Sequence, residues 1–181
     1  MISLVGLPGS GKSTVGRQLA RRLSLPFIDS DHVIETRLGC SIREFFDREG
    51  EDRFRDLEAS VLDELSQGPD GIFSTGGGSV LRPHNRERLH QRTRVVYLRS
   101  HPDELFRRLR HDRSRPLLQV ADPLQRLRDL FVVRDPLYRE TAHFVIETGR
   151  PSVATLVNMI LMQLELAGHL PHRDAATALK P

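Results

Sequence analysis

Short apolar runs alternate with amphipathic segments along this chain. A short continuous apolar run is typical of a buried strand, whereas apolar side chains three or four residues apart are typical of a helix. The five expected strands are Ile2–Val5, Pro26–Ile28, Gly71–Thr75, Val95–Leu98 and Phe144–Ile146. Strands that are separated by helices pair in parallel through right-handed crossovers. The pattern therefore predicts an α/β fold in which helices cover a parallel sheet.

Apolar spacing and capping residues predict where the helices lie. Ser41 and Glu44 form a capping box, and the short helix that follows is expected to be separate from a longer one that begins near Phe54. Asp122 is the N-cap of a helix that we expect to end near Pro136. The other expected helices span Val15–Leu23, Val33–Leu38, Phe54–Leu65, Asn85–His90, Leu105–Leu109 and Ser152–Leu166.

The length of the chain favours one domain. Domains have roughly 150 residues, and this chain has 181. We expect a single domain over residues 1–168 and a disordered tail over 169–181. The segment at about 111–121 is polar and basic without apolar periodicity, and we expect it to form a mobile lid.

Composition and charge narrow the cellular location and the partner. No apolar run could span a bilayer, and Cys40 has no second cysteine to pair with. A Gly-rich loop lies where a signal peptide would need its apolar stretch, so we expect a cytoplasmic protein. The formal net charge is +3, but the arginines are spread along the chain and aromatic residues make up 6% without tryptophan. These features argue against a nucleic-acid platform.

A phosphate-binding loop is the strongest chemical signal in the sequence. Residues 6–13 match the pattern G-x-x-x-x-G-K-[ST] between a predicted strand and a predicted helix. Backbone N–H groups of such a loop cradle phosphates, Lys12 can reach the β- and γ-phosphates, and the Ser13 hydroxyl can bind Mg²⁺. The expected nucleotide-binding residues are Gly9, Ser10, Gly11, Lys12, Ser13 and Thr14.

Asp29 and Asp31 follow the second predicted strand and should lie at the same sheet edge as the phosphate loop. One carboxylate can hold Mg²⁺ through water, and the other can accept the proton of an attacking hydroxyl. The alternative is that one of them is only a helix N-cap.

Three further segments carry weaker signals. Gly76, Gly77 and Gly78 permit close approach of the backbone to a ligand, although a flexible turn explains them equally well. Arg55 has Glu58 three residues later, which could steer the guanidinium or form an ordinary solvent-exposed pair. The arginines of the polar loop, Arg115 among them, could close over a triphosphate or remain solvated.

Taken together, these motifs resemble the shikimate kinase family over residues 2 to about 166. The matching segments are Gly-Leu-Pro-Gly-Ser-Gly-Lys-Ser-Thr at 6–14, Asp-Ser-Asp at 29–31, Gly-Glu, Phe-Arg and Glu at 50–51, 54–55 and 58, Thr-Gly-Gly-Gly at 75–78, Arg-Pro-Leu-Leu at 115–118 and Arg-Asp-Pro-Leu-Tyr at 134–138. A phosphate loop alone would indicate only a superfamily, whereas five further motifs in the same order are more specific.

The resemblance implies a five-stranded parallel sheet like that of P-loop nucleoside monophosphate kinases, with ATP, Mg²⁺ and shikimate as ligands. It implies a monomer that phosphorylates the 3-hydroxyl of shikimate in chorismate biosynthesis and binds neither nucleic acid nor membranes. The implied catalytic residues are Asp31, Lys12 and Arg115; the implied shikimate ligands are Asp31, Arg55, Gly76, Gly77, Gly78 and Arg134; Ser13 and Asp29 would hold Mg²⁺; and Arg108, Arg115 and Pro151 would contact ATP.

Other functions are open on sequence alone. A kinase for another small sugar acid such as gluconate, or for a nucleoside monophosphate, would share the phosphate loop. A nucleotide-binding regulatory module without catalysis is a second alternative. A GTPase is less favoured because the chain has no Asn-Lys-x-Asp segment.

Overall fold

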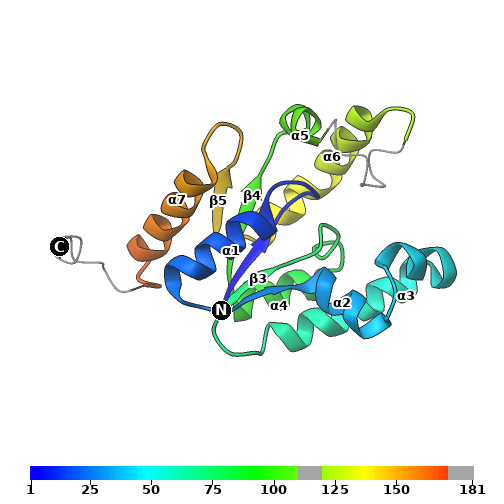
Figure 1. The fold of residues 1–181 in the computed structure, drawn as a ribbon, viewed down its shortest axis with the longest axis horizontal. Coiled ribbons are helices and arrows are strands. Elements are labelled where there is room, and N and C mark those ends of the chain that lie inside the picture. The colour runs from blue at the N-terminus through cyan, green and yellow to red at the C-terminus, as the bar shows by residue number, and fades with distance from the viewer. Residues whose placement is uncertain (110–119, 171–181) are drawn as a thin grey trace.

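Five parallel strands form the centre of the molecule in the computed structural model, which describes residues 1–109 and 120–170 (Figure 1). The strand order is β2-β3-β1-β4-β5, which confirms the predicted α/β fold. The strands are β1 (Ile2–Val5), β2 (Phe27–Asp29), β3 (Ile72–Ser74), β4 (Arg94–Arg99) and β5 (Phe144–Glu147). The helices are α1 (Lys12–Leu23), α2 (Ser30–Leu38), α3 (Ile42–Leu65), α4 (Pro83–Arg92), α5 (Pro102–Leu109), α6 (Pro123–Thr141) and α7 (Val153–Leu166).

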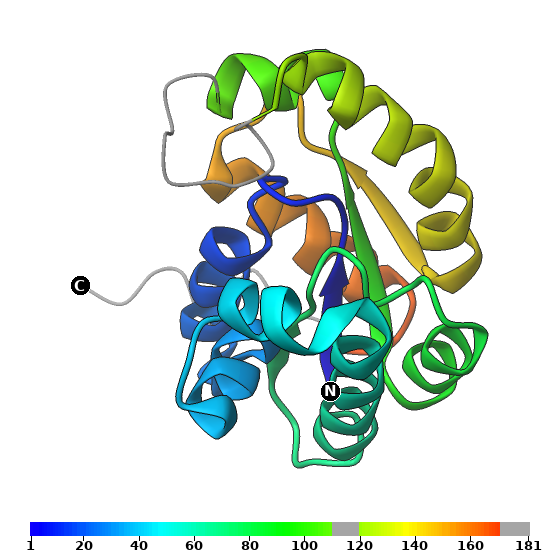
Figure 2. The same ribbon diagram turned by 90° about the vertical axis from the view of Figure 1, so that its right-hand side faces the viewer.

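Helices cover both faces of the sheet, so that side chains from both faces of the strands are buried. On one face, α1 and α7 pack against alternate residues of the strands, among them Leu4 and Val96. On the other face, α3 to α6 pack against the intervening residues, among them Val5 and Tyr97. A third cluster around Ile34 joins α2 to α3 (Figure 2). The two helices α2 and α3 thereby form a subdomain at the edge of the sheet.

One predicted helix boundary is confirmed and another is wrong. The two helices expected around Phe45 and from Phe54 meet at Gly50, whose φ of +82° is not helical, so α3 consists of two helices joined by a kink. The helix expected to end near Pro136 continues to Thr141. Pro136 is exposed, so water can reach the carbonyl left without its N–H partner, and buried Tyr138 anchors the last turn.

Most of the predicted lid and tail lie outside the described residues, and so does Arg115. His169 and Leu170, the first two residues of the predicted tail, are described and are packed. The His169 N–H donates to Leu164 O at 2.8 Å, its Nδ1 accepts from Arg94, and Leu170 packs on the core beside α7. Among the described residues, no helix is both long and apolar enough to cross a membrane.

His143, just before β5, is hydrogen-bonded to the beginning of β4. Its backbone N–H donates to Val95 O at 2.9 Å, and its Nδ1 accepts the Val95 N–H at 3.0 Å. His90 of α4 stacks on the His143 ring with centroids 4.2 Å apart. Burial lowers the pKa of His143 to about 4, and the neighbouring charges of His90, Arg94 and His169 add to this shift. The ring is therefore neutral near pH 7, as an acceptor at Nδ1 must be.

We expect the free energy of unfolding to fall as the pH drops from 6.5 towards 4, and to fall less in the variant His143→Asn. The pKa of His143 is about 4 in the folded chain against 6.5 for an ordinary histidine. Between these values the unfolded chain binds more protons, so each lowering of the pH favours unfolding. Urea midpoints at pH 7 and 4.5 measure the effect. His84→Asn, which changes an exposed histidine of α4, is the matched control. Equal pH dependence in wild type and His143→Asn would contradict this assignment.

Candidate active site

A cavity of about 320 Å³ lies beyond the carboxyl ends of β1, β2 and β3. Ligands of open parallel sheets bind at this edge. The cavity is lined by Pro8, Gly9, Gly11, Lys12, Ser13, Thr14, Asp29, Asp31, Ser74, Thr75 and Gly77. It therefore brings together the phosphate loop, the aspartate pair and the glycine loop, three segments that are far apart in the sequence.

The phosphate loop connects β1 to α1 and leaves the N-terminus of α1 open. Gly11 is the N-cap with φ +95°, a conformation that suits glycine, and no side chain caps the helix. Lys12 Nζ donates to the carbonyl oxygens of Gly6 and Leu7 at 2.8 and 3.0 Å, which holds the ammonium over the loop. Ser10 Oγ is buried and has no hydrogen-bond partner within the described residues. A helix N-terminus without a side-chain cap, an ammonium and a buried hydroxyl form a site suited to an anion.

Asp29 caps α2 and also contacts the phosphate loop. Its Oδ1 accepts the Asp31 N–H at 3.1 Å, and its Oδ2 accepts the Ser13 hydroxyl at 2.7 Å. The N-cap interpretation is thus correct for Asp29, but it does not exclude metal binding, because the second oxygen faces Ser13. A hydroxyl and a carboxylate side by side are the oxygen donors that Mg²⁺ binds, usually together with water and phosphate. The residues present therefore fit this ion.

Asp31 lies one residue into α2 and is half-buried at the cavity. Burial raises the pKa of its carboxyl to about 6, and Asp29, Glu58 and Glu35 raise it further, while Lys12 opposes the shift. No hydrogen bond of this carboxylate occurs within the described parts of the chain. A carboxylate with a raised pKa is a stronger base than an ordinary aspartate.

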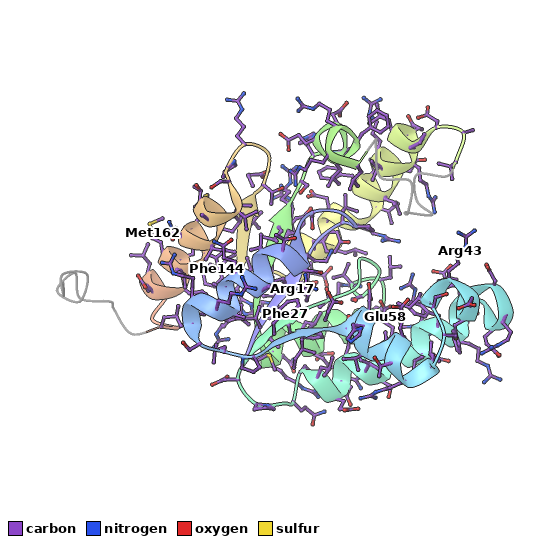
Figure 3. The ribbon with its side chains drawn as sticks, viewed as in Figure 1. Arg17, Phe27, Arg43, Glu58, Phe144 and Met162 are labelled. Atoms are coloured by element: carbon purple, nitrogen blue, oxygen red, sulfur yellow. The ribbon has the colours of Figure 1, made fainter. Side chains whose placement is uncertain are left out.

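Arg55 and Glu58 form a largely buried ion pair on α3. The solvent-exposed pair, which was one of the two alternatives open on sequence, is therefore not what forms. Arg55 Nη1 donates to Glu58 Oε2 at 2.7 Å, and the Glu58 side chain is 2% exposed. Glu58 also accepts the Ser79 hydroxyl at 3.2 Å. Figure 3 shows Glu58 inside the molecule, whereas Arg43, on the first part of the same helix, projects outward.

The glycine loop passes close to these charged groups. A Cβ at Gly76 would lie 2.7 Å from Asp31 Oδ1 and 2.9 Å from Glu58 Oε1, and a Cβ at Gly78 would overlap the Arg55 guanidinium. The close approach favours glycine here, because any larger residue would displace these charged side chains. Asp31 and Arg55 thus both lie against one short backbone segment.

Arg134 on α6 approaches the glycine loop from the other direction. Its Nη1 donates to Gly77 O at 3.0 Å, and the Tyr138 hydroxyl donates to the same oxygen at 2.5 Å. Sequence reasoning included Tyr138 in the motif at 134–138 but gave it no role at the site, and it missed Ser79. Tyr138 follows Arg134 by four residues and so shares its helix face, which is the signal that could have found it. The signal for Ser79 is weaker, since only its place after the three glycines marks it.

Arg108 and Pro151 are both associated with the loop that follows β5. Arg108 Nη2 donates to Thr148 O at 3.0 Å, and Pro151 lines a second cavity together with His101 and Gly149. Arg108 lines a neighbouring cavity that shares Gly149. These two residues are therefore placed apart from the first cavity, at the ends of β4 and β5.

Comparisons with known proteins identify the family. The family model described as "Shikimate kinase" matches residues 8–165. Shikimate kinases of Paracidovorax citrulli and Ralstonia nicotianae are 65% and 58% identical, over 94% and 92% of this chain and 94% and 88% of their own. A solved shikimate kinase from Acinetobacter baumannii, in complex with shikimate, is 48% identical with a TM-score of 0.86, over 93% of this chain and 94% of that one. The chain belongs to the shikimate kinase family.

Proposed function

We propose that this protein transfers the γ-phosphoryl group of ATP to the 3-hydroxyl of shikimate, giving shikimate 3-phosphate and ADP for chorismate biosynthesis. The observation that carries the proposal is the position of Asp31, at one cavity with the phosphate loop and the glycine loop. The A. baumannii relative with shikimate bound supports the choice of acceptor.

The phosphate loop would bind the ATP phosphates through Gly9, Gly11 and Thr14 backbone groups, with Lys12 neutralising the transferring phosphoryl group. The buried Ser10 hydroxyl would gain a partner from the phosphates. The adenine would lie near Arg108 and Pro151, beside the two further cavities. The assignment of Arg115 to the ATP phosphates rests on the family motif at 115–118.

Mg²⁺ would be held by the Ser13 hydroxyl directly and by Asp29 through water, which is consistent with the 2.7 Å contact between the two. When bound, the ion would neutralise phosphate charge. The hydrogen bond from the Asp31 N–H to the other Asp29 oxygen would fix the orientation of the carboxylate for this role.

Arg55 and Arg134 would grip the acceptor's carboxylate. A guanidinium binds a carboxylate through two parallel N–H bonds, which favours an acidic substrate over a neutral sugar. Glu58 holds Arg55 in one orientation and limits its conformational freedom. Backbone groups of Gly76, Gly77 and Gly78 would contact the ring of the substrate, and Gly77 lines the cavity.

Asp31 would orient the ring hydroxyls and accept the proton of the 3-hydroxyl as its oxygen attacks the γ-phosphorus. The bond from that phosphorus to the bridging oxygen of ADP then breaks. Catalysis in such reactions comes mainly from positioning and charge neutralisation. The raised pKa of Asp31, about 6, leaves it ionised at pH 7 yet more basic than an ordinary aspartate.

We infer that the chain is a monomer with one domain over 1–168 and a lid at about 111–121. The family match over residues 8–165 supports the single domain. A small-molecule acceptor is favoured over nucleic acid or membrane, since several arginines outside the site are paired with acidic residues, as in Arg82 with Asp56 and Arg128 with Asp103.

A coupled assay for ADP tests the proposal. Shikimate, gluconate and a nucleoside monophosphate are compared as acceptors with MgATP. We expect ADP release to depend on shikimate, and mass spectrometry to find shikimate 3-phosphate. Turnover with gluconate or a nucleoside monophosphate alone would contradict the proposal and favour a kinase for that acceptor. No turnover with any acceptor would favour a nucleotide-binding module without catalysis.

Replacing Asp31 by asparagine should lower kcat by about two orders of magnitude or more, the usual effect of removing a general base. ATP affinity should persist because the phosphate loop is unchanged. The thermal midpoint should not fall, since ionising a carboxyl whose pKa is raised in the folded chain costs stability at pH 7.

Asp47→Asn, which changes an exposed aspartate of α3, is the matched control for that variant and should retain full activity. Normal turnover in Asp31→Asn would refute the assignment of the base.

Replacing Arg134 by alanine should raise the KM for shikimate at least about tenfold, because charged hydrogen bonds to the substrate are lost. The KM for ATP should change little. Arg128→Ala, an exposed position of the same helix, removes an equal charge away from the cavity and is the control. Isothermal titration that finds equal shikimate affinity in both variants would exclude a substrate contact by Arg134.

A further inference from the structure

The Gly77 carbonyl receives two hydrogen bonds from one helix. Tyr138 Oη donates to it at 2.5 Å and Arg134 Nη1 at 3.0 Å. A carbonyl oxygen has two lone pairs, so these two donors saturate it. The tyrosine side chain is fully buried, and burial raises its pKa above the ordinary value, which keeps the hydroxyl protonated and able to donate.

This carbonyl fixes the orientation of the glycine loop. The described chain has no cis peptide bond, so the Gly78 N–H points opposite to the Gly77 C=O, away from α6. The other side of Gly77 is held as well, because a Cβ there would lie 2.8 Å from Pro8 Cδ of the phosphate loop. Gly77 is thus fixed between α6 and the phosphate loop, and the direction of its carbonyl decides which way the next amide faces.

The two donors differ in what else they can do. Arg134 must turn part of its guanidinium to an incoming carboxylate, whereas the Tyr138 hydroxyl can keep donating to the carbonyl, because its other polar neighbour is Arg134 itself. A carbonyl left without a donor in a partly buried site costs free energy. Tyr138 therefore keeps Gly77 satisfied when Arg134 shifts towards a ligand.

We propose that Tyr138 is a positioning residue for the acceptor: its hydroxyl holds the Gly77 carbonyl, and thereby the glycine loop and Arg134, in the arrangement that binds a carboxylic-acid substrate. This inference rests on the proposed function, because it concerns the affinity of that same site for its acceptor. Tyr138 acts through Gly77 and Arg134 and is not itself a catalytic residue.

The fold supplies a matched control in Tyr97. Its ring packs on the Tyr138 ring with centroids 4.9 Å apart, and both side chains are fully buried. The Tyr97 hydroxyl donates instead to Asp135 Oδ1 at 2.8 Å. Asp135 keeps two arginine donors, Arg99 and Arg139, each at 2.9 Å, when that hydroxyl is removed. Each tyrosine-to-phenylalanine change thus removes one hydroxyl from the same pair of rings. Only the change at Tyr138 removes a hydrogen bond to the glycine loop.

The test compares steady-state kinetics of wild type, Tyr138→Phe and Tyr97→Phe with the coupled ADP assay. Loss of one net hydrogen bond should raise the KM for shikimate about three- to tenfold in Tyr138→Phe. The KM for ATP should change by less than about twofold, and Tyr97→Phe should keep the wild-type KM for shikimate. Thermal melting shows whether both variants are folded and equally destabilised.

Three results would overturn the positioning role. One is an unchanged KM for shikimate in a folded Tyr138→Phe, and another is an equal rise of both KM values, which would mean general loosening. The third is the same rise in Tyr97→Phe, which would assign the effect to the ring pair. Wild-type protein without turnover of shikimate contradicts the proposed function itself, and the positioning role falls with it.

Discussion

A carboxylate held close to other carboxylates is the constraint on which the site depends. Asp31 has Asp29 and Glu58 among its neighbours and Lys12 as the cation that opposes them. Left to water, these groups would separate. The chain keeps them together because Asp29 is tied to the start of α2 and to Ser13, and Glu58 is tied to Arg55 and Ser79. Asp29 and Glu58 are thus each fixed by partners of their own. The cost of bringing the carboxylates together appears at Asp31, whose pKa is raised.

The sheet makes this concentration of charge possible. The ends of β1, β2 and β3 are adjacent, so the phosphate loop, the aspartate pair and the glycine loop meet without long connecting segments. The helices then approach from two sides, with α3 bringing Arg55 and α6 bringing Arg134 against the same three glycines. Strand order therefore decides which charges meet, and the small size of glycine decides how closely.

Sequence was sufficient where local chemistry determines structure. The phosphate loop, the five strands and the capping box at Ser41 all follow from patterns within a dozen residues. Tertiary packing overrode local signals elsewhere. Pro136 ends a helix in isolation, but Tyr138 anchors the turn beyond it. The Arg55 and Glu58 pair packs against the glycine loop and Ser79, which are distant in sequence.

The pKa of Asp31 in the ligand-free protein is the most informative measurement, because it reports the burial of this carboxyl and the nearby carboxylates on which the base assignment rests. Carbon-13 NMR of aspartate carboxyls follows it, with the Asp31 signal identified by its loss in Asp31→Asn. We expect a titration midpoint near pH 6. A midpoint near 4, the value of an aspartate in water, would contradict it.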